Sequence, residues 1–496
     1  MKNNTKIFSN SFYLLLDLAV ITLLSFIFWF ILGRLLTPAE TGVVFTSWGL
    51  SSIISVLTIF GLQSALVKLI SENENDKKVS AFIQISFKYV LIANVTAFLL
   101  IILLHQYFSS LIGFTFLITL LTGLNVFIVS LSNLSSAVLG GFQSMKKIFT
   151  TDFIGYTFKI LAIPILVFIG LSSTGALIAL FGTFFLIFIL RAKPSWFSFK
   201  TSSEIRSTIF KYSLPSFVSG IAGIVFSNIQ YVILTIIKNA QATGIFGYAM
   251  LVTSPLDLIT ITFGSALFPI ISNLSTRNSG KTQSYLLNLI TRYSLMIVLP
   301  AAVFLAYFGK PFFLIFFPQY VSAIILFPFL IPAAIIFGIA SIFSGSIFAL
   351  RKPHITRNIS VIMTLSFIGL SIPLTQMFSS NGLAAAYLIS TVIMLLLSYF
   401  YISKLISLKI PFLSLTKLIL ATILFFIFLV ISGSIVASIF VKIFFVAIGF
   451  VFYVLGLFLV KFFIKEDVDI LRAFERRLPI MKKQIHFVAD FIEKRI

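Results

Sequence analysis

Long runs of apolar residues follow one another along almost the whole chain, and short polar breaks separate them. Each run is long enough to cross a bilayer as a helix, for which about 20 apolar residues suffice. The predicted spans are residues 10–33, 43–70, 81–104, 114–139, 152–169, 174–190, 212–236, 245–271, 285–308, 321–349, 358–378, 383–402, 415–437 and 443–463. Barrel strands need only about 10 residues of alternating polarity, and these runs do not alternate. The pattern predicts an all-α polytopic membrane protein with about 14 transmembrane helices.

Composition agrees with this pattern, since 59% of the 496 residues are apolar and only 10% are charged. Soluble domains average about 45–50% apolar and about 25% charged residues, so a soluble enzyme is excluded. The chain has no cysteine, no P-loop, no dinucleotide-binding glycine motif and no metal spacing among its three histidines. We therefore expect a protein that is not an enzyme and that has neither a cofactor nor a metal site.

The Lys and Arg residues indicate the orientation of the spans. With a cytoplasmic N-terminus, 29 of them fall on the cytoplasmic side, four fall outside and three lie within spans. This asymmetry predicts that both termini are cytoplasmic in a multi-pass protein of the plasma (inner) membrane. It also accounts for most of the net charge of +22, so nucleic acid is not expected as a partner.

Two halves of the chain resemble each other at an offset of about 202 residues. The sequence Thr41-Gly42-Val43 matches Thr243-Gly244-Ile245, and each opens a span after a predicted external loop. Similar matches join Ile7-Phe8-x-x-Ser11 to Ile209-Phe210-x-x-Ser213 and Ser64-Ala65-Leu66 to Ser265-Ala266-Leu267. Both repeats begin at the cytoplasmic side, so they are parallel repeats, which usually hold a substrate cavity between them.

The repeat divides the chain into five expected parts. These are an N-terminal six-helix lobe (1–190), a cytoplasmic linker (191–211), a C-terminal six-helix lobe (212–402), helices 13 and 14 (403–463) and a cytoplasmic amphipathic tail (464–496). In the tail, apolar residues recur at helical spacing among charges, which favours an interfacial helix; a solvated extension is the alternative. The apolar positions are Val468, Leu471, Phe474 and Leu478.

The first 80 residues resemble a known family. The segment 33–42, Gly-Arg-Leu-Leu-Thr-Pro-Ala-Glu-Thr-Gly, and the segment 61–65, Gly-Leu-Gln-Ser-Ala, are similar to motifs of Wzx-type polysaccharide flippases. These proteins belong to the multidrug/oligosaccharidyl-lipid/polysaccharide (MOP) exporter superfamily. The resemblance implies movement of a lipid-linked oligosaccharide to the external leaflet. Lipid II flippases of the superfamily have an Arg-Asp pair in the first span, whereas Asp17 has no neighbouring arginine, so that branch fits less well.

Ionisable side chains inside spans are costly and often mark functional cavities. Five such residues are the candidate substrate-binding residues: Asp17, Lys88, Lys159, Asp257 and Arg292. A diphosphate headgroup would be attracted by the three cations, and the two carboxylates would orient the cations or bind a coupling ion. For Lys88 and Arg292, snorkelling to the cytoplasmic surface is the alternative.

Two of these charges lie on polar or small faces near a proline. Lys159 lies on one helical face with Gly155 and Tyr156, and Pro164 leaves a backbone carbonyl near it without its usual donor. Asp257 shares a face with Thr260 and Gly264. Such faces are expected to line a cavity or to meet another helix.

The function predicted from these features is a flippase that moves an isoprenoid-(pyro)phosphate-linked glycan from the cytoplasmic to the external leaflet by alternating access. The expected partners are the lipid-linked glycan, membrane lipids, a coupling proton or sodium ion and glycan assembly enzymes. The alternative is an ion-coupled multidrug exporter with an acidic, aromatic cavity around Asp17 and Asp257. A membrane-embedded glycosyltransferase or polymerase would need a long acidic loop, which the sequence lacks.

Overall fold

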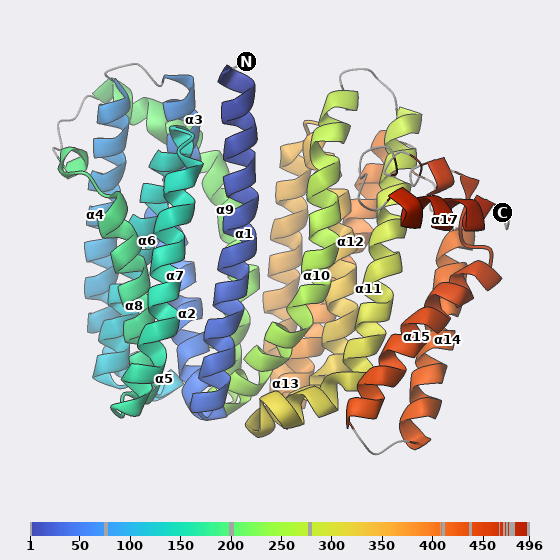
Figure 1. Cartoon of the computed structure of the whole chain (residues 1–496). Helices are drawn as coiled ribbons and strands as arrows, with labels where there is room; N and C mark the ends of the chain where they lie inside the picture. The colour runs from blue at the N-terminus through green and yellow to red at the C-terminus, as the bar shows by residue number, and fades with distance from the viewer. Residues whose placement is uncertain are drawn as a thin grey trace. The chain divides into compact units, whose positions relative to one another are not determined.

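The structure is a computed structural model. It describes residues 2–73, 78–197, 203–275, 280–406, 408, 412–435, 439–465, 467–469, 472, 475 and 482–493. Throughout this described part of the chain, the regular elements are helices (Figure 1). The first of them are α1 (Lys2–Leu35), α2 (Pro38–Ile59), α3 (Leu62–Glu72), α4 (Lys78–Leu103), α5 (His105–Ile112), α6 (Phe116–Gly141), α7 (Met145–Phe168), α8 (Ser172–Arg191), η1 (Pro194–Phe197) and α9 (Ser203–Ile237).

The later helices are longer. They are α10 (Ala240–Ser275), α11 (Gly280–Phe316), η2 (Pro318–Leu326), α12 (Phe327–Ala349), α13 (Pro353–Ile406), α14 (Phe412–Ile435), α15 (Ile439–Leu459) and α17 (Lys482–Glu493). Twelve helices of the described chain are long and apolar enough to cross a membrane. The all-α polytopic fold predicted from the sequence is therefore confirmed.

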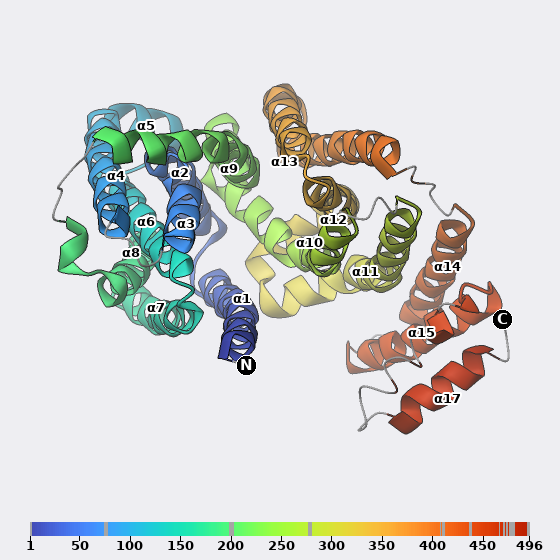
Figure 2. The same cartoon turned by 90° about the horizontal axis from the view of Figure 1, so that it is seen from above.

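The difference between 12 and about 14 spans has a structural reason. Helix α13 has 54 residues and contains both predicted spans 358–378 and 383–402, with non-helical backbone at Ser379 (φ 55°, ψ −138°). A Cβ atom at Gly382 would lie 1.8 Å from the carbonyl oxygen of Leu374, so the reversal of direction requires a glycine. The two segments of α13 are visible in Figure 2. The last predicted span, 443–463, corresponds to α15 (Ile439–Leu459).

The second predicted span is broken rather than continuous. Helix α2 ends at Ile59, and α3 begins at Leu62 after two residues in the left-handed region, Phe60 (φ 51°) and Gly61 (φ 72°). A Cβ atom at Gly61 would lie 2.2 Å from the carbonyl oxygen of Ser213, so the glycine also permits close approach of α9. Apolar periodicity alone did not show this break.

The chain forms two compact units, of which the first comprises Met1–Val252, Phe316–Phe329 and Arg357–Ser390. In this unit α7 packs against both α1 and α8. Small residues allow the close packing: a Cβ atom at Gly155 of α7 would lie 2.4 Å from the Ile187 side chain of α8. A buried cluster that includes Phe28, Ile163 and Leu177 joins the three helices.

The matching Thr-Gly segments of the predicted repeat lie against each other in the first unit. A Cβ atom at Gly42 would be 1.7 Å from the Ala240 carbonyl oxygen, and a Cβ atom at Gly244 would be 1.9 Å from the Pro38 carbonyl oxygen. Pro38 and Ala240 are themselves 202 residues apart, so each contact is the counterpart of the other. Such reciprocal contacts are the property of a two-fold related interface.

A further pair of contacts is related by the same offset of 202 residues. The ring of Tyr248 covers Gly33, and the counterpart contact is a hydrogen bond of 2.6 Å between Thr46 Oγ1 and Thr235 Oγ1. Tyr320 of η2 also binds at this end of α1: its hydroxyl group donates a hydrogen bond of 2.9 Å to the Leu36 carbonyl oxygen. These contacts support the repeat offset found in the sequence. We call the surface formed by Pro38, Gly42, Ala240 and Gly244 the glycine contact.

The second unit comprises Thr253–Ile315, Leu330–Thr356 and Thr391–Ile496. Helices α14 and α15 pack together in it, and α17 contacts the end of this pair through Ala489, which packs with Val468, Phe458 and Phe463. Leu471, Phe474 and Leu478 of the predicted amphipathic tail, and residues 198–202 of the predicted linker, lie outside the described residues. The division into two lobes, a linker and a tail stays a prediction.

Candidate functional site

A group of buried charges joins α1, α7 and α8 in the first unit. Arg191, at the end of α8, is only 1% exposed, and its Nη2 lies 2.6 Å from Asp152 Oδ1 of α7. Its Nε donates to Thr151 Oγ1 over 2.7 Å, and its Nη1 donates to the Ser136 hydroxyl. Sequence reasoning assigned Arg191 to a cytoplasmic loop. The structure instead makes it a satisfied buried cation.

Asp17 of α1 lies in electrostatic range of this pair. Its carboxylate is within electrostatic range of both Asp152 of α7 and Arg191 of α8. The Asp17 Oδ1 atom is buried and has no hydrogen-bond partner among the described residues. The ring of the neighbouring Tyr13 is 6.1 Å from that of Phe149 on α7, which holds α1 against α7 at this level.

Lys159 lies two turns further along α7 and is 4% exposed. Its Nζ lies 4.3 Å from the ring centroid of Tyr156 and 4.5 Å from that of Phe28 on α1. Among the described side chains, no carboxylate lies within ion-pair distance of this ammonium group. Cation–π contacts therefore replace an anion as its neighbours. The face shared by Gly155, Tyr156 and Lys159 was predicted from the sequence, and the structure places it against α1 and α8.

The second unit contains Arg292 of α11, which is 4% exposed. Its guanidinium group donates to both carboxylate oxygens of Asp467, and Tyr293 donates to the same carboxylate. The rings of Tyr293 and Phe462 flank the guanidinium carbon at 5.2 and 4.8 Å. Arg292 is therefore neutralised within the protein and does not snorkel to a surface.

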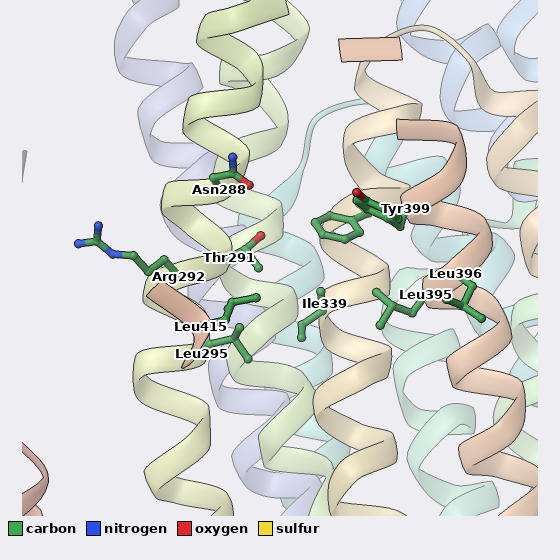
Figure 3. A pocket seen from close by; sticks show the side chains of 10 residues that line it. Asn288, Thr291, Arg292, Leu295, Ile339, Leu395, Leu396, Tyr399 and Leu415 are labelled. Atoms are coloured by element: carbon green, nitrogen blue, oxygen red, sulfur yellow. The ribbon is translucent and has the colours of Figure 1, made fainter. Parts of the chain in front are cut away.

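A cavity of about 340 Å³ lies beside Arg292 (Figure 3). It is lined by Asn288, Thr291, Arg292, Leu295, Ile339, Phe343, Leu395, Leu396, Tyr399 and Leu415. In Figure 3 the guanidinium group of Arg292 points away from the side chains of α12 and α13 across the cavity. The cavity wall is thus mostly apolar, with amide and hydroxyl groups on α11.

Asp257 lies on α10 in the same unit. Its Oδ1 accepts a hydrogen bond of 3.0 Å from the Leu258 backbone N–H, and among the described residues it has no cationic partner. The α10 face that continues from Asp257 lines a cavity of about 370 Å³ with Gly264 and Ser265, opposite Ser341 of α12. The predicted stripe of Asp257, Thr260 and Gly264 therefore does meet another helix, because Gly338 of α12 also packs on Thr260.

Lys88 is half-buried on α4 and has no ion pair among the described residues. The neighbouring Gln84 donates to the Ser195 carbonyl oxygen over 3.1 Å. Of the five predicted residues, Asp17, Lys88 and Lys159 lie in the first unit, and Asp257 and Arg292 lie in the second. In the described part of the chain, no group of His, Asp and Glu residues is arranged to hold a metal ion.

A profile of the family described as "Polysaccharide biosynthesis protein" matches residues 31–325, which is more than half of the chain. The chain belongs to this family. The matched region includes Lys159, Asp257 and Arg292, and it also includes the glycine contact. The family supports the resemblance found in the opening motifs of the sequence.

Two curated relatives come from archaea. The chain is 24% identical over 421 residues to "Probable low-salt glycan biosynthesis flippase Agl15" of Haloferax volcanii, covering 83% of this chain and 88% of the relative. It is 26% identical over 302 residues to "Uncharacterized membrane protein MJ1375" of Methanocaldococcus jannaschii, covering 55% and 71%. Both are named as membrane proteins or transporters, as expected for a polytopic chain.

Solved structures show the same fold at low sequence identity. The lipid II flippase MurJ in an inward closed conformation matches with a TM-score of 0.71 and 16% identity, covering 90% of this chain and 98% of that one. An inward-facing multidrug resistance MATE family transporter of the MOP superfamily matches with a TM-score of 0.64 and 14% identity, covering 78% and 94%. The chain therefore has the fold of these membrane transporters.

Proposed function

We propose that this protein flips an isoprenoid-(pyro)phosphate-linked oligosaccharide from the cytoplasmic to the external leaflet of the plasma membrane by alternating access. Its family and the flippase name of the Haloferax relative support this substrate class. In the proposed topology both termini are cytoplasmic, and the glycine contact lies at the external end of its helices. Glycan assembly enzymes supply the cargo, and a proton or sodium gradient drives its movement.

The observation that carries the proposal is the state of Lys159. An ammonium group that is 4% exposed and lacks a carboxylate partner among the described residues is costly to keep in a membrane. The rings of Phe28 and Tyr156 lower this cost without neutralising the charge. A phosphate group would supply the missing anion, with a charge-assisted hydrogen bond to Nζ. Lys159 would then bind the phosphate headgroup. The charges of Asp17 and Arg191 would contribute to the electrostatic potential around it.

A second candidate function is ion-coupled export of cationic drugs, and Asp257 favours it. Its carboxylate has backbone partners but no cation among the described residues, beside a cavity with hydroxyl groups. In the flippase reading, the same carboxylate binds the coupling ion. The two functions differ in the side chain that the cargo needs: an anionic headgroup needs Lys159, and a cationic drug needs Asp257.

Complementation separates them in a strain that lacks its own glycan flippase. Lys159→Met keeps the length and apolar body of the side chain but removes its charge, and we expect it to lower surface glycan at least tenfold. The matched control is Lys238→Met, because Lys238 is exposed at the end of α9 and belongs to no site. Full glycan export by Lys159→Met, together with loss of drug resistance in Asp257→Asn, would replace the flippase proposal with the exporter.

A further inference from the structure

The carboxylate of Asp467 occupies a site built from three donors. Besides Arg292 and Tyr293, the backbone N–H of Ile464 donates to its Oδ2 over 2.9 Å. Asp467 follows the last apolar helix in the chain, whereas Arg292 lies on α11, 175 residues earlier. Both side chains are at most 5% exposed. A guanidinium group, a phenol and a backbone amide directed at one anion form a general oxyanion site, which suits phosphate as well as carboxylate.

Arg292 is not fully satisfied by this internal anion. Its Nε atom is buried and has no hydrogen-bond partner among the described residues. Both Asp467 contacts use the same Nη2 atom, so the arginine does not form the two parallel bonds that its planar group permits. A buried donor without a partner destabilises the folded protein. A phosphate group, with more acceptor oxygens and a larger charge, would satisfy Nε as well.

The site also adjoins open space. Arg292 lines the cavity of about 340 Å³, and Asn288 and Thr291 on the same helix add an amide and a hydroxyl to its wall. An anion in this cavity would first meet Asn288 and Thr291, because the guanidinium group of Arg292 points away from the α12 and α13 side chains of the opposite wall (Figure 3). The described part of the Asp467 segment is held by its four carboxylate hydrogen bonds, by the bond from the Asp467 backbone N–H to the Ile464 carbonyl oxygen, and by packing of Val468 on Ala489, Phe458 and Phe463.

We propose that Asp467 is an internal stand-in for a phosphate group, and that a lipid phosphate or diphosphate displaces it from Arg292. Exchange of one anion for another keeps the buried Arg292 paired throughout. The displaced Asp467 then releases the segment that follows α15. This site rests on the proposed function only for the identity of the lipid, since any phosphate with access to the cavity has the required chemistry.

Binding to the purified full chain in detergent tests the exchange. The probes are farnesyl diphosphate, inorganic diphosphate and mixed micelles that contain phosphatidylglycerol, and they separate an isoprenyl headgroup, a free anion and an ordinary membrane lipid. Asp467→Asn removes the competing charge and should tighten binding of at least one probe about tenfold. The double variant Asp467→Asn/Arg292→Met should lose that gain. Asp490→Asn, a half-exposed acid in the same C-terminal region, is the matched control and should bind like the wild type.

A second measurement does not depend on the stability of these variants. Asp469→Cys places a spin label at an exposed position two residues after Asp467 in a chain without native cysteine. Saturating probe should raise the mobility of the label. Unchanged label mobility at saturation, or binding by Asp467→Asn that is no tighter than the wild type, would overturn the proposal. Diphosphate-dependent release of the label without glycan transport in complementation would keep this site and reject the flippase function.

Discussion

Substitution of Gly42 by Ala tests whether the glycine contact closes one side of the transporter. The added Cβ would lie 1.7 Å from the Ala240 carbonyl oxygen, whereas a carbon and an oxygen approach without a bond to about 3.3 Å. The two backbones must therefore separate by about 1.6 Å, since neither atom belongs to a flexible side chain. Overpacking of this kind costs about 1–3 kcal/mol. At 2 kcal/mol, the equilibrium shifts about 30-fold away from the closed contact.

Spin labels report the separation directly. Ala39 and Gln241 are exposed, flank the glycine contact and are 202 residues apart, so cysteines at both positions label its two counterpart segments. We expect a short distance in the wild type and a longer one in Gly42→Ala. Gly244→Ala should also lengthen this distance. The free-energy cost of the double variant should be smaller than the sum of the two single costs, because both substitutions open the same contact. A disulfide between the two cysteines should stop transport while the protein stays folded.

The control is Gly223→Ala on α9, where an added Cβ would meet no atom within 4 Å. Both substitutions raise helix propensity by about 1 kcal/mol, so this effect cancels in the comparison. A distance in Gly42→Ala equal to that in Gly223→Ala would refute the steric argument. Full transport with the disulfide complete would refute the role of the contact in alternating access.

Three further predictions concern the fold and the topology. Arg191→Met should lower the free energy of unfolding by about 3–5 kcal/mol, because it leaves Asp152 as a buried unpaired charge, and Asp152→Asn in the same chain should restore part of it in thermal unfolding. Cysteines at Ala240 and Ser195 should react with impermeant reagents from outside and from the cytoplasm, respectively; the opposite sides would reverse the proposed orientation. Gly382→Ala should lower the melting temperature, because its Cβ would clash with a backbone carbonyl 1.8 Å away, and an unchanged melting temperature would contradict the tight reversal in α13.

Hydrophobic pattern was sufficient to predict the spans, because lipid requires every apolar segment of that length to be helical. The break at Phe60 and Gly61 was not predictable from apolar runs, since it depends on close approach of Ser213 from a distant helix. The reversal near Ser379 was anticipated only as a boundary between two spans. Local periodicity thus identifies elements, while their breaks arise from tertiary contact.

The candidate charges show the same limit. The sequence predicts that Lys159 and Tyr156 share a helical face, whereas burial of Lys159 against Phe28 depends on packing between α7 and α1. Arg292 pairs with Asp467 and Asp152 pairs with Arg191, and Asp467 and Arg191 lie far away in sequence, in the predicted tail and linker. Ion pairs between distant helices leave no periodic signal, so only the structure identifies them.

The most direct test of the central claim is flipping of an isoprenyl-diphosphate-linked glycan in proteoliposomes that contain the purified protein. Glycan exposed on the outer leaflet is measured by cleavage with an impermeant glycosidase. We expect transport by the wild type and by Lys238→Met, partial transport by Lys159→Arg and at least a tenfold loss in Lys159→Met. Wild-type transport by Lys159→Met would contradict the claim that a buried cation on α7 binds the phosphate of the cargo.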